Sequence, residues 1–446
     1  MIQPEEAQPI AQGDYIRLLL WTIVIAIPIA ALTVVYVWMI HHGAEIYRQI
    51  PALIGVPAWL FTLLIAVTGG LLVGLGLRFL GERSEESEGL AGQISAGQAK
   101  YKGMAILLGI ALIGILSGAS VGPEGPLGHA GAGIGAWLAD KRRYNREQSR
   151  LLSLGGVAAV FGAFLGTPMS SALMTLEFTR QLTVPIYANL IVTTVASLFG
   201  AMVMFLIIHA SPGGTGSYPI EGTFTPTSIL WAVVLGLVGL AWAFLFKIIF
   251  QSTQRLTRPL DRFPVLKPMF GGLAFGLVGA WMPLTLFSGQ FEFESILEHG
   301  AQLGIGVLLL LAVLKLFTLS ISLSTGFPGG FVFPVFFSSG ALGYAIHLLF
   351  PIIPLPVSVV GTLAGVGGGV MRMPFAIILL LGVISSPALL PVSVISALTS
   401  FMTATMLDAG SARRAMEESQ AEMRETYAAE KWTTSEDEAP PGEQKL

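Results

Sequence analysis

Long uncharged stretches of mostly apolar residues follow one another along nearly the whole chain. Each reaches about the 20 residues that an α-helix needs to cross the hydrocarbon core of a bilayer. The first seven are Leu18 to Ile40, Trp59 to Leu77, Gly103 to Val121, Leu151 to Leu176, Leu182 to Ile208, Gly222 to Phe246 and Pro268 to Phe291. Beyond them, Gly300 to Leu407 is interrupted only by Lys315, His347 and Arg372. The pattern predicts an all-α polytopic membrane protein with roughly ten or more helices, not all of them spanning.

The composition agrees with a chain surrounded by a lipid bilayer. Of the 446 residues, 53% are hydrophobic and only 11% are charged, whereas soluble domains have about 25% charged residues. A net charge of −3 gives no reason to expect a nucleic-acid partner. The chain has no cysteine and no His-Glu-x-x-His motif, so we expect neither a metal nor another cofactor. Without a targeting extension, the inner membrane of a prokaryotic cell is the expected location.

Charge and glycine content divide the chain into segments. Two basic segments, Asp140 to Arg150 and Gln254 to Lys267, should face the cytoplasm by the positive-inside rule. A glycine- and proline-rich loop follows Ile208 near the midpoint. The expected organisation is an N-terminal cytoplasmic segment (1–17), a first transmembrane repeat (18–210), a linker loop (211–227), a second transmembrane repeat (228–411) and a cytoplasmic tail (412–446).

A spacing of glycines and proline in the first half recurs in the second half. Gly122, Pro126 and Gly135 are followed 208 residues later by Gly330, Pro334 and Gly343, and Pro168 is followed 206 residues later by Pro374. Two similar offsets indicate one duplication. Broken hydrophobic segments at matching places in two repeats are typical of transporter binding sites, so the segments Gly122 to Gly135 and Ser324 to Gly343 are candidate site elements.

The first of these segments contains an acid, Glu124, within the sequence GPEGP. The prolines and glycines interrupt the helix, and a helix that resumes after them begins inside the membrane with free N–H groups, which favour an anion. The second segment, with GGFVFP, offers the same device. The Glu124 carboxylate is itself an anion that fits such a site and would leave on protonation, which predicts a proton-sensitive gate. The alternative is a glutamate that caps a helix.

These motifs resemble those of the CLC family of chloride channels and proton-coupled anion exchangers. GPEGP is similar to the family's GREGP segment and GGFVFP to its GxFxP segment, in the same order, and the resemblance extends from about Tyr15 to Gly410. It implies a CLC-like inverted repeat of tilted and broken helices, assembled as a homodimer that transports chloride or another small anion. It also implies that Glu124 is the gate, and that the backbone around Gly122, Glu124 and Gly125, with Phe331 and Val332, binds the anion.

The inner half of the expected site departs from the family pattern. The family's first anion motif has only a weak match at Glu85 to Gly97, where Ser87 could supply a hydroxyl. The inner glutamate that relays protons in the exchangers aligns with Phe178, and the adjacent Glu177 is the alternative proton carrier. A channel and a proton-coupled exchanger therefore both stay open. We expect a structural role for Lys315, a loop position for Glu292, and a core position for His129, with a pore position as the alternative.

Two other function classes need consideration. An intramembrane serine hydrolase would use Ser120 or Ser170 with His129 or His209, but the chain has no nucleophile elbow, and we expect no enzyme. An organic-solute symporter with the same inverted-repeat plan would need a larger cavity with more polar residues than the sequence offers.

Overall fold

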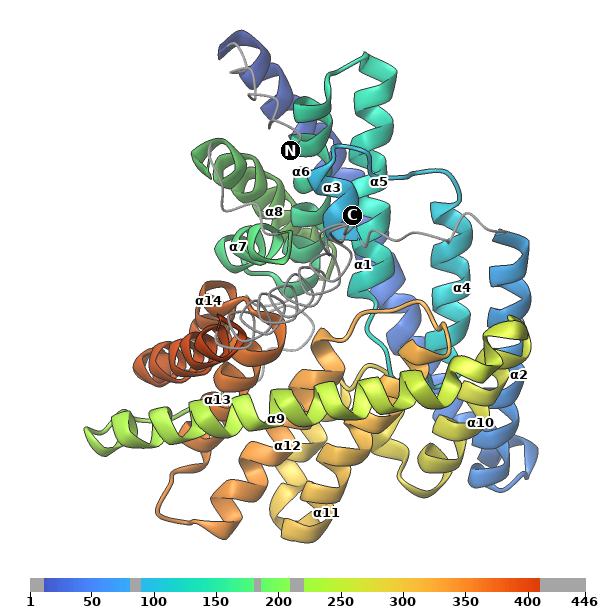
Figure 1. Ribbon diagram of the computed structural model, residues 1–446, viewed down its shortest axis with the longest axis vertical. Helices are drawn as coiled ribbons and strands as arrows, with labels where there is room; N and C mark the ends of the chain where they lie inside the picture. The colour runs from blue at the N-terminus through green and yellow to red at the C-terminus, as the bar shows by residue number, and fades with distance from the viewer. Residues whose placement is uncertain (1–11, 81–89, 180–185, 209–219, 410–446) are drawn as a thin grey trace, which may run out of the picture. The chain divides into compact units, whose positions relative to one another are not determined.

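The computed structural model describes residues 12–80, 90–179, 186–208 and 220–409 (Figure 1). The internal contacts of the chain define one compact unit up to Ser400 and a second from Phe401, and the fold described below is that of the first. Within the described ranges, every element is a helix apart from two isolated β-bridges. The prediction of an all-α membrane fold is confirmed.

The helices fall into two series along the chain. The first series is α1 (Gln12–Ile54), α2 (Ala58–Leu80), α3 (Leu90–Ser95), α4 (Met104–Leu116), α5 (Glu124–Arg142), α6 (Arg146–Leu165), α7 (Pro168–Phe178) and α8 (Ile186–Ile208). The second is α9 (Thr227–Thr257), η3 (Arg258–Arg262), α10 (Leu266–Trp281), η4 (Pro283–Thr285), α11 (Glu292–Ser324), α12 (Val332–Leu349), α13 (Leu355–Val366), η5 (Gly367–Met371, a π-helix), α14 (Pro374–Ile384) and η6 (Pro387–Leu389). Helix then continues to Ser400, the last residue of this unit.

Eight helices among the described residues are long and apolar enough to cross a membrane. Three of the uncharged stretches do not form one spanning helix each. Gly103 to Val121 and Pro268 to Phe291 contain helices of only 13 and 16 residues, and Leu151 to Leu176 forms two helices. Gly166 ends α6 in the left-handed conformation at φ 64°, and Pro168 begins α7 in a new direction. Uncharged length alone does not reveal such a break, whereas the Gly-x-Pro sequence does.

The two series repeat one another in detail. Helix α4 ends at Leu116 and α5 begins at Glu124, while α11 ends at Ser324 and α12 begins at Val332, so both turns fall 208 residues apart. Gly118 and Gly326, at equivalent places in these turns, have the same φ of 95°, a value that favours glycine. Helices α7 and α14 have 11 residues each. The spacing of glycines and prolines predicted this duplication.

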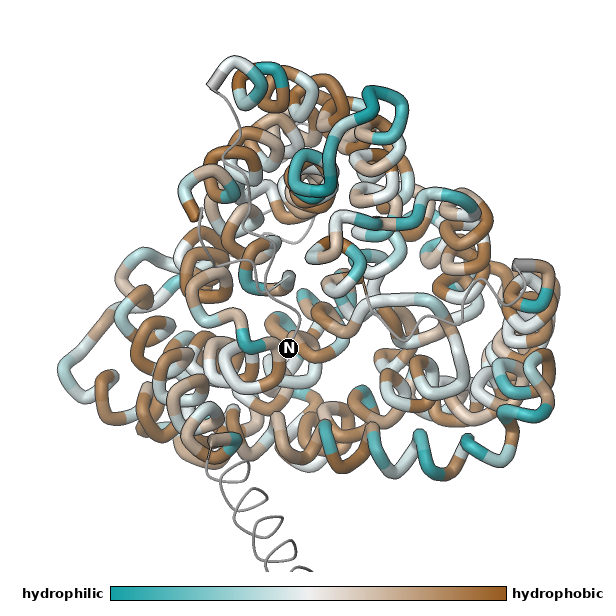
Figure 2. Tube along the Cα trace, turned by 45° about the horizontal axis from the view of Figure 1, so that its top comes forward, coloured by the Kyte–Doolittle hydropathy of each residue, from teal (hydrophilic) through white to brown (hydrophobic). Residues whose placement is uncertain are grey.

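Many large apolar side chains of the long helices point outward. In α1 they include Leu20, Val24 and Trp38, and in α8 they include Leu198 and Phe205. Figure 2 shows hydrophobic residues along most of the helical tubes, with hydrophilic residues gathered at turns. A surface of this kind is stable against lipid and not against water. The helices α5, α6, α12 and α13 are by contrast buried along most of their length.

Candidate functional site

The site forms where the N-terminal ends of α5 and α12 meet. The Gly122 amide donates to the Gly330 carbonyl at 2.9 Å, and the Gly330 amide donates to the Gly122 carbonyl at 2.7 Å. This pair is an antiparallel β-bridge between equivalent residues of the two repeats. Equivalent residues that bond reciprocally lie on a two-fold axis, which is the relationship expected of an inverted repeat.

Local sequence explains why a helix begins inside the protein at this point. Pro123 precedes α5 as its N-cap and has no N–H to satisfy, and no side chain caps the helix. The chain reaches Pro123 through Gly118, Ser120 and Val121, which are buried. The first amides of α5 are therefore free for a ligand or an acidic side chain. The break predicted from GPEGP is confirmed.

The Glu124 side chain crosses from one helix end to the other. Its Oε1 accepts a hydrogen bond from the Val332 amide, in the first turn of α12, at 2.8 Å. The side chain is buried, and Oε2 has no hydrogen-bond partner. A carboxylate from α5 thus lies at the positive end of α12, where the dipole and a free amide favour a negative charge. The same free amide and dipole would favour a small anion.

Two glycines make room for this carboxylate. A Cβ on Gly330 would overlap the Glu124 Cδ and Oε1 atoms, and a Cβ on Gly122 would overlap Oε2. A third glycine, Gly125, faces the backbone of the segment before α12, where a Cβ would come within 2.9 Å of the Gly329 carbonyl carbon. Side chains at these positions would displace Glu124 or separate the two helix ends.

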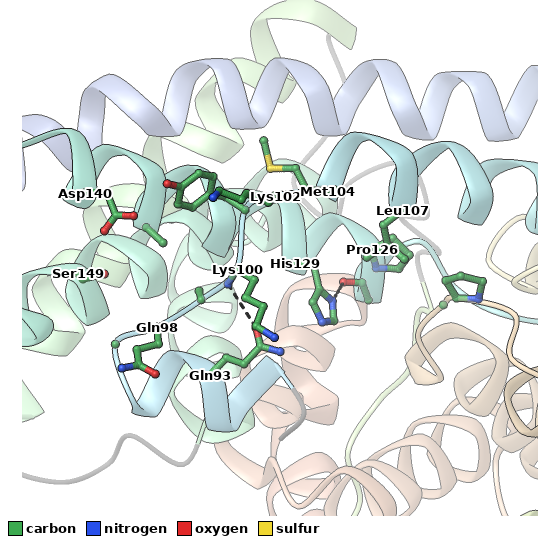
Figure 3. A pocket seen from close by; sticks show the side chains of 18 residues that line it. Gln93, Gln98, Lys100, Lys102, Met104, Leu107, Pro126, His129, Asp140 and Ser149 are labelled. Carbon is green, nitrogen blue, oxygen red and sulfur yellow. Dashed lines mark hydrogen bonds between the residues drawn. The ribbon is translucent and has the colours of Figure 1, made fainter. Parts of the chain in front are cut away.

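A large cavity reaches the site from one side (Figure 3). Its volume is about 820 Å³, and Gly125, Pro126 and Gly329 form part of its lining. The remaining lining residues come from α3, the loop 96–103, the start of α4, the later turns of α5, α6 and the segment before α12; they include Gln93, Lys100, Tyr101, Lys102, Asp140 and Ser149. Since Asp140 and Ser149 belong to the basic segment expected in the cytoplasm, we call this cavity the cytoplasmic vestibule.

The predicted site residues are mostly brought together. Gly122, Glu124 and Val332 are in contact, and Gly125 lines the vestibule. Phe331 precedes α12 as its N-cap, so Val332 supplies the amide that binds the carboxylate. Ser87 lies outside the described residues.

Sequence reasoning failed to identify several vestibule residues. His129 lines the vestibule and is only half-buried, so the expected core position is wrong. Lys100 and Lys102 also line it, and the polar sequence GQAKYK between two apolar stretches could have indicated them.

Glu177 and Phe178 lie at the end of α7. The Glu177 carboxylate accepts hydrogen bonds from the Phe375 amide at 3.1 Å and the Ala376 amide at 2.8 Å, one on each oxygen. Both amides belong to the first turn of α14, so Glu177 caps that helix end from a different helix. The half-buried Phe178 packs against the apolar core. A second buried acid of the first repeat therefore lies at a helix N-terminus of the second.

Two buried charges near η4 and α11 have structural partners. The Lys315 ammonium donates to the carbonyls of Thr285, Leu286 and Phe287 at 2.8 to 3.1 Å, which confirms the structural role. Glu292 is the first residue of α11 and is buried, so the expected loop position is wrong. It forms an ion pair with Arg48 of α1, and buried carboxylates of this kind require such a partner.

Comparisons with known proteins agree with this geometry. The sequence profile of the family described as "Voltage gated chloride channel" matches residues 102–405. Among curated proteins, "Putative ion-transport protein YfeO" of Escherichia coli is 29% identical over 341 residues, which cover 72% of this chain and 76% of that protein. The protein of the same description from Escherichia fergusonii is 27% identical over 344 residues, with 72% and 76% covered.

Solved structures share the fold. A slow cyanobacterial Cl⁻/H⁺ antiporter has a TM-score of 0.72 and 19% identity, covering 90% of this chain and 96% of its own. A CLC-type fluoride/proton antiporter has a TM-score of 0.72 and 21% identity, covering 88% and 96%. A eukaryotic CLC transporter has a TM-score of 0.68 and 16% identity, covering 89% and 73%.

These findings decide between the function classes. Members of the matched family are channels or transporters and not enzymes. The hydrolase alternative also lacks geometric support, because the Ser170 hydroxyl donates to the Ala376 carbonyl and the His129 ring contacts the Gly125 carbonyl. The candidate spans and the bacterial relatives identify a multi-pass protein of the inner membrane. With the paired helix ends and a profile match over residues 102–405, this chain belongs to the voltage gated chloride channel family.

Proposed function

We propose that this protein exchanges chloride for protons across the inner membrane through a pore that the Glu124 carboxylate closes. The observation that carries the proposal is the hydrogen bond from the Val332 amide to Glu124 across the two helix ends. In this position the carboxylate excludes a second anion by charge and by volume. Protonation removes the charge that binds it to the helix end, so the side chain leaves and chloride takes its place.

The free oxygen of the carboxylate supports a movable side chain. Oε2 has no partner, so the docked position does not satisfy both oxygens of the carboxylate. The Glu124 side chain is also flexible, because a glutamate has three rotatable bonds. Partial charges at helix ends hold an anion without the tight binding of a lysine or arginine, which suits rapid passage.

Exchange is favoured over a channel by two structural neighbours. They are a Cl⁻/H⁺ antiporter and a fluoride/proton antiporter, and both cover most of this chain. Chloride is the anion we expect, with fluoride as the alternative. We also propose a homodimer with one pore in each subunit, as the CLC resemblance implies.

The test is ion flux from liposomes that contain the purified protein. Chloride efflux and proton uptake are recorded together for the wild type, for Glu124→Gln, and for Glu298→Gln as a control at an exposed glutamate of α11. We expect coupled fluxes in the wild type and in the control, and chloride flux without proton flux or pH dependence in Glu124→Gln. Chloride flux without proton flux in the wild type would indicate a channel. If neither chloride nor fluoride crosses faster than in empty liposomes, the proposal is wrong.

A further inference from the structure

A proton that travels between the cytoplasm and Glu124 needs a carrier, and the described residues do not supply the expected one. Phe178 has no ionisable group. Glu177 spends both carboxylate oxygens on the amides of Phe375 and Ala376. An acid that gives up its proton to form two charge-assisted hydrogen bonds is a poor intermediate carrier, because each protonation breaks those bonds.

The cytoplasmic vestibule offers another route to the same helix end. It extends from the polar loop 96–103 to the backbone of Gly125 and Gly329. Gly125 follows Glu124 directly, and Gly329 precedes Gly330, whose missing side chain leaves room for the Glu124 carboxyl. The inner end of the vestibule is therefore adjacent to the docked carboxylate.

His129 stands on α5 in the wall of this vestibule. Its Nδ1 lies 3.0 Å from the Gly125 carbonyl oxygen, and Figure 3 shows the ring directed along α5 toward that carbonyl. A carbonyl only accepts hydrogen bonds, so Nδ1 carries the proton in the neutral ring and Nε2 is the basic nitrogen. The Gly125 carbonyl thereby fixes the tautomer and the ring orientation. The half-buried side chain is part of the cavity lining.

The other ionisable side chains that line the vestibule are Lys100, Tyr101, Lys102 and Asp140. Tyr101 and Asp140 share a hydrogen bond, near the end of α5 that is distant from Glu124. Gln93, from α3, and Pro328 and Gly329, from the segment before α12, are uncharged. Among these residue types, only imidazole ordinarily gains and loses a proton between pH 5 and 8.

We propose that His129 carries protons between the cytoplasmic vestibule and Glu124, an inference that rests on the exchange function proposed above. Nε2 takes a proton from vestibule water, and the imidazolium gives it, through an intervening water, to the Glu124 carboxylate. His129 returns to its neutral form, and Glu124 becomes neutral and leaves the Val332 amide. Five residues of helix separate the two groups by about 7.5 Å of rise and about 140° of rotation. The two groups are therefore not in direct contact, and the proton passes between them through water.

The experiment compares proton and chloride fluxes in three variants. His129→Ala and His129→Gln remove the carrier, and the second keeps a side chain of similar length. The control is His347→Ala, because His347 is also half-buried with Nδ1 at 2.7 Å from a backbone carbonyl, that of Ile353, but lies outside the vestibule lining. We expect the ratio of proton flux to chloride flux to fall by about tenfold or more in both His129 variants. Positioned acid–base groups in enzymes contribute more than tenfold, but here water offers a second route for the proton.

Chemical rescue separates proton transfer from packing. Added imidazole should restore proton flux in His129→Ala, after subtraction of the proton leak that imidazole causes in liposomes without protein, and should not affect His347→Ala. Unchanged coupling in the His129 variants overturns the inference, as does an equal fall of both fluxes without rescue. Wild-type chloride flux without proton flux overturns it as well and leaves anion transport standing. Absence of any anion flux in the wild type refutes the proposed function itself.

Discussion

A single added methyl group should displace the gate. Gly330→Ala places a Cβ where the Glu124 Cδ and Oε1 atoms now lie, and the carboxylate, as the free end of a flexible side chain, yields more readily than the backbone. The bridge between residues 122 and 330 uses only backbone atoms, so it survives the substitution. The docked carboxylate loses the hydrogen bond from the Val332 amide, which for a charged acceptor is worth about 1.5 to 3 kcal/mol.

That loss changes the equilibrium constant between the docked and the displaced side chain by about ten- to a hundredfold in favour of the displaced state. Chloride then reaches the helix ends without protonation of Glu124. In reconstituted liposomes we expect chloride flux to rise at neutral pH, to depend little on pH, and to carry few protons. Gly109→Ala is the control, because a Cβ there meets no atom within 4 Å. If Gly330→Ala keeps the wild-type pH dependence and coupling while Glu124→Gln abolishes both, the docked carboxylate is not the closed gate.

Three further predictions concern the buried charges, and each is read from thermal unfolding in detergent. Glu177→Ala leaves the Phe375 and Ala376 amides without their acceptor and should cost about 1 to 3 kcal/mol, lowering the melting temperature; an unchanged melting temperature would mean that the cap contributes nothing. Lys315→Met removes the donor for three buried carbonyls, and we expect a loss of about 3 kcal/mol or more, whereas Lys315→Arg should recover part of it. Arg48→Ala leaves the buried Glu292 carboxylate without its ion-pair partner, at a cost of about 1 to 3 kcal/mol. An unchanged melting temperature would contradict the assignment.

The chain sequence was sufficient to locate the helix ends and the duplication. Proline and glycine act on the backbone within a few residues, so GPEGP and GGFVFP identify the starts of α5 and α12 from local sequence alone. The same residues reveal the offset of 208 residues between the repeats. Gly118 and Gly326, which have the same φ of 95°, are also separated by this offset. Local backbone chemistry is readable in a sequence because each residue carries its own conformational preference.

The partners of the buried acids could not be read in this way. Glu124 meets Val332 at a separation of 208 residues, and Glu177 meets Ala376 at a separation of 199. Both partners are backbone amides, which every residue except proline possesses, so no side chain marks them. The vestibule was missed for a similar reason, since its lining combines α3, a polar loop, α4, α5 and α6, and the segment before α12. Only the packing of the two repeats brings these segments together.

The contrast between the two acids explains why one can be a gate and the other an anchor. Both are buried, and both lie at a helix N-terminus of the second repeat. Glu177 has an amide on each of its two oxygens, whereas Glu124 leaves one oxygen unpaired. Each hydrogen bond to a charged group is worth about 1.5 to 3 kcal/mol, and Glu177 has such a bond on both oxygens. A buried oxygen without a partner also costs free energy. This cost raises the free energy of the docked state of Glu124 and favours release. The weaker attachment is what a side chain must have if one proton is to remove it.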